Sequence, residues 1–272
     1  MDRFLGIDIG GTKTLLATLS EDGHILQSRH FPTPQSYEEF LHELTSNLQE
    51  LEVTDAKACC IGIPGHIDRE KGVVFALGNL PWRDKPIRDD VSDLISGKKV
   101  IIENDARLAG LSEAQLIKDQ YKSVLFLTIS TGIGGALIED GQIVNALRDM
   151  EMGLMPLWHG DGFVYWEKFA SGRAVVEQFG KKAADIEDPE TWHKVADNIA
   201  YGLAAVCSVL QPEVVVLGGS VGAHADKFGN FVKDFLTQHL HPVVRQPKAI
   251  LPARRPAEAV IFGCYELLKQ KN

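Results

Sequence analysis

Residues 4–26 read FLGIDIGGTKTLLATLSEDGHIL, and residues 124–144 read VLFLTISTGIGGALIEDGQIV. Each stretch contains an apolar strand, a turn of glycine with threonine, a second apolar strand, an Asp-Gly turn and a third strand. Asp-Gly between apolar runs is a strong hairpin signal, because the turn needs positive φ angles that glycine adopts readily. Two copies of one meander predict two related domains rather than a single sheet, the alternative being a chance similarity of two short segments.

Helix and strand patterns alternate along the rest of the chain. Ser36 and Glu39 form a capping box ahead of apolar residues with helical spacing, namely Phe40, Leu44, Leu48 and Leu51. Asp188 and Pro189 mark the beginning of another helix. We expect strands over residues 58–63, 98–102 and 214–217, and helices over residues 105–117, 167–180, 189–210, 226–240 and 256–269. This alternation favours an α/β fold with a sheet in each domain.

The composition excludes several classes of protein. Of 272 residues, 44% are hydrophobic and 24% are charged, which is typical of a globular protein with room for two modest domains. The formal net charge of -9, without a run of Lys and Arg, argues against a nucleic-acid partner. No segment approaches the roughly 18–20 apolar residues that span a bilayer, and the strand-like pattern from the first residues onward is not what we expect of a signal peptide. The four cysteines include no Cys-x-x-Cys and suit reduced thiols, so a cytoplasmic location is expected.

The first turn, Asp8-Ile9-Gly10-Gly11-Thr12-Lys13, has the features of an anion site. Adjacent glycines let backbone N–H groups approach an anion, and the threonine hydroxyl adds a donor. Neither a Walker loop nor a dinucleotide fingerprint fits, because a strand follows the turn where both motifs require a helix. The second copy, Ser130–Gly135, behaves identically. Glycine-rich hairpins are commonly structural, but two copies facing each other would hold a polyphosphate from both sides.

A third glycine turn, Gly218-Gly219-Ser220, follows the apolar run 214–217. With a helix coming later, a nucleoside could pack against this bare backbone. The turn could equally be an ordinary connection between a strand and a helix.

The segment Glu103-Asn104-Asp105-Ala106 lies where the strand 98–102 gives way to a helix. Side chains at the carboxyl end of such a strand face the region where α/β proteins bind ligands. Phosphoryl transfer needs positioning, charge neutralisation and a base for the attacking hydroxyl, and Asp105 could supply that base. Alternatively, Asp105 only caps the helix that begins at Ala106.

Over nearly its whole length the chain resembles the ROK family of sugar kinases. The matching segments are DIGGTK (8–13), GIPGHID (62–68), GNLPW (78–82), ENDA (103–106), STGIGG (130–135), Glu-x-Gly (151–153), WEKFASG (166–172) and LGGSV (217–221). The resemblance implies a two-domain actin-like ATPase (ribonuclease H-like) fold with an interdomain cleft. Residues 1–106 with 258–272 would form the smaller domain, and residues 107–257 the larger one.

The resemblance also implies roles for individual residues. Asp105 would be the catalytic base, and Asp8 would help to hold Mg²⁺ with ATP. Contacts to the phosphates are expected from Gly10, Gly11, Thr12, Lys13, Thr131 and Gly132. Gly218 and Gly219 would lie near the adenosine. The sugar hydroxyls would be contacted by Asn79, Asn104, Asp105, Glu151 and Glu167, since carboxylate and amide oxygens accept hydroxyl donors well. From the residues alone, Glu151 and Glu167 could be exposed surface acids.

One departure from the family pattern bears on the sugar. The family usually has Glu-x-Gly-His, with the His completing a zinc site formed by a cysteine cluster, whereas this chain has Leu154 and no cysteine between residues 61 and 206. We therefore expect no zinc site. His159 could replace the missing His, or it could be a loop residue that faces solvent.

These observations predict an ATP-dependent, glucokinase-like sugar kinase that phosphorylates a hexose, with the 6-hydroxyl as the expected acceptor. A polyphosphate-dependent glucokinase and a non-catalytic sugar-sensing protein are the alternatives. The expected partners are a sugar and ATP, with no nucleic acid and no membrane. Relatives of this type are commonly dimers, which implies a homodimer.

Overall fold

The computed structural model describes residues 3–271 except 52, 54, 79 and 256. The chain forms two compact units. One contains the residues up to Ser112 together with those from Glu258 onward, and the other is Glu113–Ala257. The chain therefore enters and leaves the second unit once each, and the second unit is a continuous insertion into the first.

The sheet of the first unit has the strand order β3-β2-β1-β4-β8. Its strands are β1 (Arg3–Ile9), β2 (Lys13–Ser20), β3 (Ile25–Pro32), β4 (Ala56–Ile63) and β8 (Lys99–Asn104). The first three form an antiparallel meander, while β4 runs parallel to β1 and β8 runs parallel to β4. A small second sheet contains β5 (His66–Asp68), β6 (Val73–Ala76) and β7 (Arg83–Lys85).

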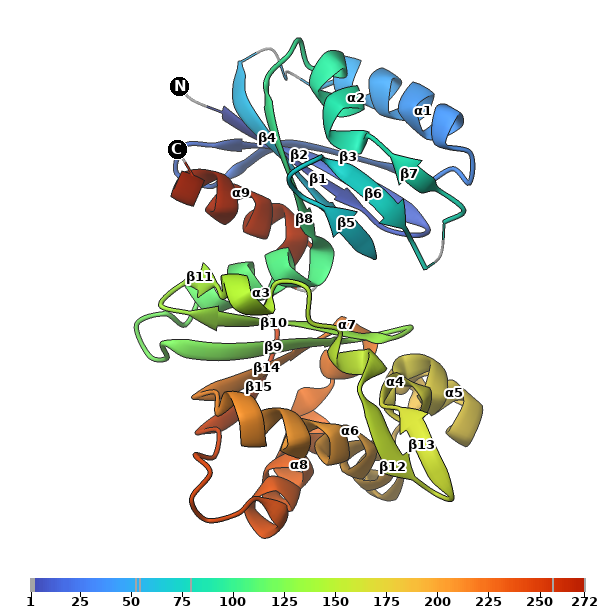
Figure 1. Cartoon of the computed structure of the whole chain (residues 1–272), viewed down its shortest axis with the longest axis vertical. Coiled ribbons are helices and arrows are strands. Elements are labelled where there is room, and N and C mark those ends of the chain that lie inside the picture. Colours follow the sequence, from blue (N-terminus) through green and yellow to red (C-terminus); the bar gives the residue numbers. More distant parts are fainter. Residues whose placement is uncertain (1–2, 52, 54, 79, 256, 272) are drawn as a thin grey trace. The chain divides into compact units, whose positions relative to one another are not determined.

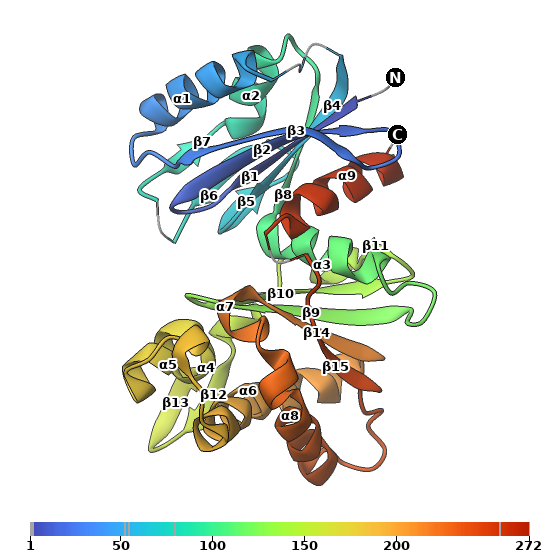
Figure 2. The same cartoon turned by 180° about the vertical axis from the view of Figure 1, so that it is seen from behind.

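Successive side chains along β1 point to opposite faces of this sheet. Leu5 and Ile7 belong to the core cluster beneath α1 (Tyr37–Gln49) and α2 (Ile87–Leu94). Between them, Gly6 faces α9 (Ala259–Lys271) so closely that a Cβ atom there would lie 3.3 Å from Ile261. Figures 1 and 2 show α1 and α2 on one face of the sheet and α9 on the other. The sheet is thus covered on both sides by helices that are distant in sequence.

The sheet of the second unit repeats the same arrangement. Its order is β11-β10-β9-β14-β15, with an antiparallel meander followed by two parallel strands. The strands are β9 (Ser123–Ile129), β10 (Ile133–Glu139), β11 (Gln142–Ile143), β14 (Val214–Gly218) and β15 (Ala249–Pro252). The prediction of a duplicated meander in two separate sheets is confirmed.

Helices and a hairpin complete the second unit. The elements are η1 (Asn145–Leu147), η2 (Met152–Leu154), β12 (Pro156–His159), β13 (Gly162–Tyr165), α4 (Glu167–Ala170), α5 (Gly172–Phe179), η3 (Ala183–Asp185), α6 (Pro189–Leu210), α7 (Gly219–Gly222) and α8 (Ala225–His239). The helix α3 (Asp105–Gln115) begins in the first unit and ends in the second. In the second unit, both carboxylate oxygens of Glu113 accept backbone N–H groups, from Arg254 at 2.8 Å and from Arg255 at 2.7 Å.

Several predicted elements have different bounds. The strand predicted at 98–102 extends to Asn104, so that Glu103 and Asn104 are held in the sheet. The helix predicted at 167–180 is broken at Ser171, whose extended backbone and side chain cap α5 by accepting from Ala174 N. The final helix begins at Ala259 rather than at 256, which lies outside the described residues. The helix after the third glycine turn begins within it, at Gly219.

The predictions for α6 and for the second Asp-Gly turn are confirmed. The helix α6 has the predicted bounds, and the Asp188 side chain caps it by accepting from Thr191 N at 2.8 Å. At the second Asp-Gly turn, Asp140 and Gly141 have φ angles of 48° and 76°, as a tight hairpin turn requires. All four cysteines are buried free thiols. Among the residues that the structure describes, no helix combines the length and apolarity needed to cross a membrane.

Candidate active site

The turn between β1 and β2 is closed by its own backbone. Gly10 N donates to Lys13 O at 3.0 Å, and a Cβ atom at Gly10 would lie 2.9 Å from that same oxygen. A larger residue at Gly10 would therefore push the turn open. Asp8 lies at the end of β1, is half-buried, and precedes the turn directly.

Two threonines, Thr14 and Thr33, stabilise this turn through hydrogen bonds, and neither was predicted from the sequence. The Thr33 hydroxyl donates to Gly10 O at 2.8 Å, and Thr33 N donates to Thr12 O at 3.1 Å. The fully buried Thr14 exchanges a hydrogen bond of 2.9 Å with the Thr33 hydroxyl. The carbonyl groups of Gly10 and Thr12 in the turn therefore both have hydrogen-bond donors from Thr33.

Two carboxyl groups of the first unit, Asp8 and Asp105, influence each other. Burial and the negative charge of Asp105 raise the pKa of Asp8 to about 7, although Lys13 opposes the shift. Burial also raises the pKa of Asp105, and the Ala106 N–H and the Arg107 guanidinium reduce that increase. Two acids that disfavour each other's ionisation are typical of a site that binds a cation or handles protons.

Asp105 both begins α3 and lies next to further buried polar groups. Its Oδ1 accepts from Ala106 N, the next residue of the helix, at 2.7 Å. Preceding it, Glu103 is fully buried and paired with Arg69, whose Nη2 lies 2.6 Å from Glu103 Oε1. Asn104 is 7% exposed and accepts through Oδ1 from Arg107 Nη1.

In the second unit, the turn between β9 and β10 meets two other segments. Gly172 N, at the beginning of α5, donates to Ser130 O at 2.6 Å. Ser220 N, in α7, donates to Ser130 Oγ at 3.1 Å. Gly219 has φ +79°, and a Cβ atom there would lie 2.5 Å from both Ile129 O and Ser130 Oγ. Of the sequence-predicted residues, Thr131, Gly132, Gly218 and Gly219 are therefore brought together.

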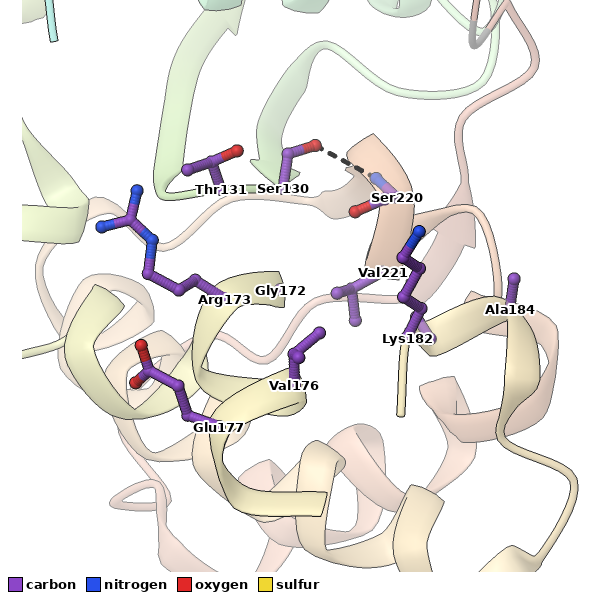
Figure 3. A pocket seen from close by; sticks show the side chains of 11 residues that line it. Ser130, Thr131, Gly172, Arg173, Val176, Glu177, Lys182, Ala184, Ser220 and Val221 are labelled. Atoms are coloured by element: carbon purple, nitrogen blue, oxygen red, sulfur yellow. Dashed lines mark hydrogen bonds between the residues drawn. The ribbon is translucent and has the colours of Figure 1, made fainter. Parts of the chain in front are cut away.

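A cavity of about 520 Å³ opens beside these turns. It is lined by Ser130, Thr131, Gly172, Arg173, Val176, Glu177, Lys182, Ala183, Ala184, Ser220 and Val221. Figure 3 shows the side chains of Arg173 and Lys182 on opposite sides of Val176 and Val221. The cavity thus combines an apolar surface with two cationic side chains, one carboxylate from Glu177, and the second glycine turn.

Most of the cavity lining was missed from the sequence. Arg173, Val176 and Glu177 lie on α5, and Lys182 lies just before η3. The only local signal is the capping sequence Ser171-Gly172, which indicates a helix N-terminus but not its neighbours. The convergence of α5 with the turns depends on contacts distant in sequence.

The two acids predicted to contact the sugar have different surroundings. Glu167 is half-buried against the second turn, with its Oε2 accepting from Ile133 N at 3.4 Å. Glu151 is exposed and precedes η2, where Gly153 packs so closely on β10 that a Cβ atom would lie 2.3 Å from Ile133 O. Asn79 lies outside the described residues.

The region of the missing family histidine is an apolar hairpin. Leu154 is 47% exposed, and His159 stacks on Phe169 with ring centroids 4.1 Å apart. His159 is exposed to solvent, as one of the two alternatives expected, but it ends β12 and packs one ring face on Phe169. Among the described residues, no group of three or more His, Cys, Asp and Glu side chains could hold a metal ion.

Comparisons with known proteins agree on one family. The sequence profile of the ROK family matches residues 4–271. A glucokinase from Streptomyces coelicolor is 31% identical over 197 residues, which are 67% of this chain but only 61% of that protein.

Two solved structures have the same fold over the whole chain. The ROK hexokinase of Thermus thermophilus is 28% identical, with a TM-score of 0.79 over 98% of this chain and 99% of that one. The inorganic polyphosphate/ATP-glucomannokinase of Arthrobacter sp. strain KM is 27% identical, with a TM-score of 0.74 over 100% of both chains.

Proposed function

This chain belongs to the ROK family, and we propose that it is a sugar kinase that transfers the γ-phosphoryl group of ATP to a hydroxyl group of a hexose. Its fold is the α/β fold that ROK sugar kinases share with the actin-like ATPases. The observation that carries the proposal is the cavity of about 520 Å³ beside two glycine turns, because its lining matches the parts of a nucleotide.

The cavity offers a separate surface to each part of ATP. Val176, Val221 and Ala184 provide an apolar surface for the base. Ser130 and Thr131 line the cavity from the second glycine turn, where Thr131 and the adjoining Gly132 would offer backbone N–H groups and a hydroxyl to the phosphates. Arg173 and Lys182 add positive charge that an anionic ligand requires.

The carboxyl groups of the first unit fit a magnesium ion that accompanies ATP. Mg²⁺ prefers oxygen ligands and is usually bound by one or two carboxylates together with substrate phosphates. Asp8 is half-buried; burial first and the negative charge of Asp105 second raise its pKa to about 7, and a bound cation would offset both effects. Asp8 would hold the ion, which would neutralise charge on the phosphates.

Asp105 would act as the general base. The hexose hydroxyl oxygen attacks the γ-phosphorus of ATP, its proton passes to the Asp105 carboxylate, and ADP leaves. Burial raises the pKa of Asp105, which makes this carboxylate a stronger base than an exposed one. The hydrogen bond from Ala106 N to Oδ1 holds its orientation.

Contacts to the sugar would come from Asn79, Asn104, Glu151 and Glu167, and the 6-hydroxyl of glucose would be the acceptor. Carboxylates suit sugar hydroxyls because each oxygen accepts at least one hydrogen bond. Glu167 also touches the second glycine turn through Ile133 N, which would link sugar binding with phosphate binding.

Inorganic polyphosphate is the alternative phosphoryl donor. Arg173 and Lys182 would suit a chain of phosphates as well as a nucleotide. The similar Arthrobacter enzyme is named for both donors. The apolar lining favours ATP for this chain, because polyphosphate has no apolar part to occupy it.

The direct test is sugar-dependent release of ADP from Mg·ATP, measured with a panel of hexoses and N-acetylhexosamines. We expect turnover with at least one sugar, glucose first. Competition between ATP and polyphosphate in single-turnover reactions would identify the preferred donor. Binding of sugars without release of ADP, with either donor present, would instead favour the sugar-sensing alternative.

A further inference from the structure

The carboxamide of Asn104 has a fixed polarity. Its Oδ1 accepts two hydrogen bonds of 3.0 Å each, from Ala106 N and from Arg107 Nη1. Both partners can only donate. A flipped carboxamide would place its own N–H groups against these donors and lose both bonds. The carbonyl oxygen of Asn104 is therefore already used in hydrogen bonds within the protein.

The amide nitrogen of Asn104, Nδ2, remains available to donate hydrogen bonds. Within the described residues, Asn104 Nδ2 makes no hydrogen bond, although only 7% of the residue is exposed. Nδ2 keeps some contact with solvent, so it can donate to a ligand that reaches it. Such a group next to the candidate base points to a ligand that supplies the missing acceptor.

Arg107 is an unusual residue to bury at this place. It follows Asp105 by two positions in α3, is 2% exposed, and reaches back to Asn104 Oδ1. A buried guanidinium is retained only where its hydrogen bonds and charge are compensated. Here it occupies the carbonyl of Asn104 and lies close enough to oppose the charge of Asp105.

We propose that Arg107 is a positioning residue that fixes Asn104 as a hydrogen-bond donor to the oxygen atom of a sugar hydroxyl. This inference rests on the proposed function and reverses the polarity expected from the sequence, where Asn104 was to accept through its amide oxygen. Asn104 then complements its neighbour, because Asp105 would accept the proton of the attacking hydroxyl while Asn104 would donate a hydrogen bond to a sugar oxygen. The site selects a sugar with an acceptor oxygen next to the hydroxyl that is phosphorylated.

Sugar analogues test the polarity in the unmodified enzyme. A deoxy sugar lacks both the donor and the acceptor, whereas a deoxyfluoro sugar keeps a weak acceptor and lacks the donor. At the position that Asn104 contacts, we expect KM for the deoxyfluoro sugar to lie clearly below that for the deoxy sugar. Asn104→Ala should remove this difference. Equal KM values for the two analogues at every position of the ring would overturn the proposal.

Substitutions at position 104 provide a second test. Asn104→Asp keeps an acceptor but cannot donate, so KM for the sugar should rise roughly tenfold, as for loss of one buried hydrogen bond. KM for ATP should change little. A variant Asn104→Asp with the KM of the wild type for the sugar would show that Asn104 accepts, and the proposal would be wrong.

Arg107 is tested by two variants. Arg107→Met leaves Ala106 N as the remaining partner of the Asn104 carbonyl, so the carboxamide is held less firmly, and KM for the sugar should rise more than KM for ATP. Arg107→Lys keeps a donor, so its KM for the sugar should lie between that of the wild type and that of Arg107→Met. A merely structural role would lower the melting temperature without separating the two KM values, which would overturn the role of Arg107.

The outcomes also separate this inference from the proposed function. If the wild-type protein turns over a hexose but fails the analogue test, only the inference about Asn104 and Arg107 is wrong. If no hexose is turned over with any donor, the proposed function fails. Calorimetric dissociation constants for the same analogues then test the polarity of Asn104 without catalysis.

Discussion

Arg69 contacts a single oxygen of Glu103 with two of its nitrogen atoms, Nε at 2.8 Å and Nη2 at 2.6 Å. The Glu103 side chain is fully buried, whereas that of Arg69 is 17% exposed. The same oxygen accepts from Asn104 N at 2.9 Å. This pair therefore anchors the end of β8 from which Asn104 and Asp105 project.

Arg69→Met should destabilise the first unit strongly. The substitution removes the Arg69 guanidinium from the buried Glu103 carboxylate, and loss of one partner of a buried ion pair costs about 3–5 kcal/mol. Urea denaturation measures the change. The matched control is Lys71→Met, which breaks the exposed pair with Asp68 and should cost less than about 1 kcal/mol. Equal losses in the two variants would contradict this account.

Asp105→Asn should reduce turnover by roughly 10²–10⁴-fold, because the amide cannot accept the proton of the hydroxyl. The amide oxygen can still accept from Ala106 N, so the melting temperature and ATP binding should be nearly unchanged. Sugar-dependent ADP release measures turnover, with the exposed Asp119→Asn as control. Turnover like that of the wild type would remove Asp105 from the mechanism.

Gly219→Ala should raise KM for ATP and lower stability together. The new Cβ atom would lie 2.5 Å from Ile129 O and Ser130 Oγ, in a backbone conformation with φ +79°. Gly160→Ala is the matched control, because Gly160 also has positive φ but no atom within 4 Å of the added Cβ. The control should lose only about 1 kcal/mol, with KM for ATP unchanged. Steady-state kinetics and thermal melting decide whether the two variants differ.

Lys182→Gln should raise KM for ATP roughly fivefold, because a partly solvated charge contributes up to about 1 kcal/mol. Lys182 lines the cavity of the second unit, whereas its neighbour Lys181 does not. Lys181→Gln should therefore leave KM for ATP unchanged, and neither variant should alter KM for the sugar. The increase in KM for ATP should shrink at high salt. A similar effect of both substitutions would indicate general electrostatic attraction instead of a site.

Asp188→Ala should destabilise α6 more at neutral pH than in acid. The hydrogen bonds with Thr191 lower the pKa of Asp188 in the folded protein. A lowered pKa means that the stabilisation is present above the pKa of the unfolded chain and is lost as pH falls through the folded value. The difference in melting temperature between the variant and the wild type should therefore decrease from pH 7 towards pH 3. A constant difference would show that the charge of Asp188 does not contribute.

Local signals predicted much of the fold. The helix α6 has the expected bounds because Asp188, Pro189 and a continuous apolar pattern all act within a few residues. The duplicated meander was predictable because its Asp-Gly turns carry their own conformational requirement. Ser171, in contrast, interrupts an apolar pattern that continues on both sides, so the break between α4 and α5 was missed.

The candidate site was less predictable because its parts meet through distant contacts. Ser130 and Ser220 are 90 residues apart and bond directly, which no spacing rule anticipates. Thr33 supports the first turn from β3, and its role depends on the register of that strand. The polarity of Asn104 depends on the orientation of one carboxamide, which follows from the side chain of Arg107.

Because the second unit is inserted into the first, the ribosome completes the sequence of the second unit before that of the first. Residues 113–257 leave the ribosome before residues 259–271, so the second unit has its complete sequence while the first does not. Until α9 emerges, Gly6 and the neighbouring face of β1 and β4 lack the helix that covers them. A nascent chain paused at this stage would expose an apolar sheet surface, and this intermediate is the one that a chaperone would need to protect.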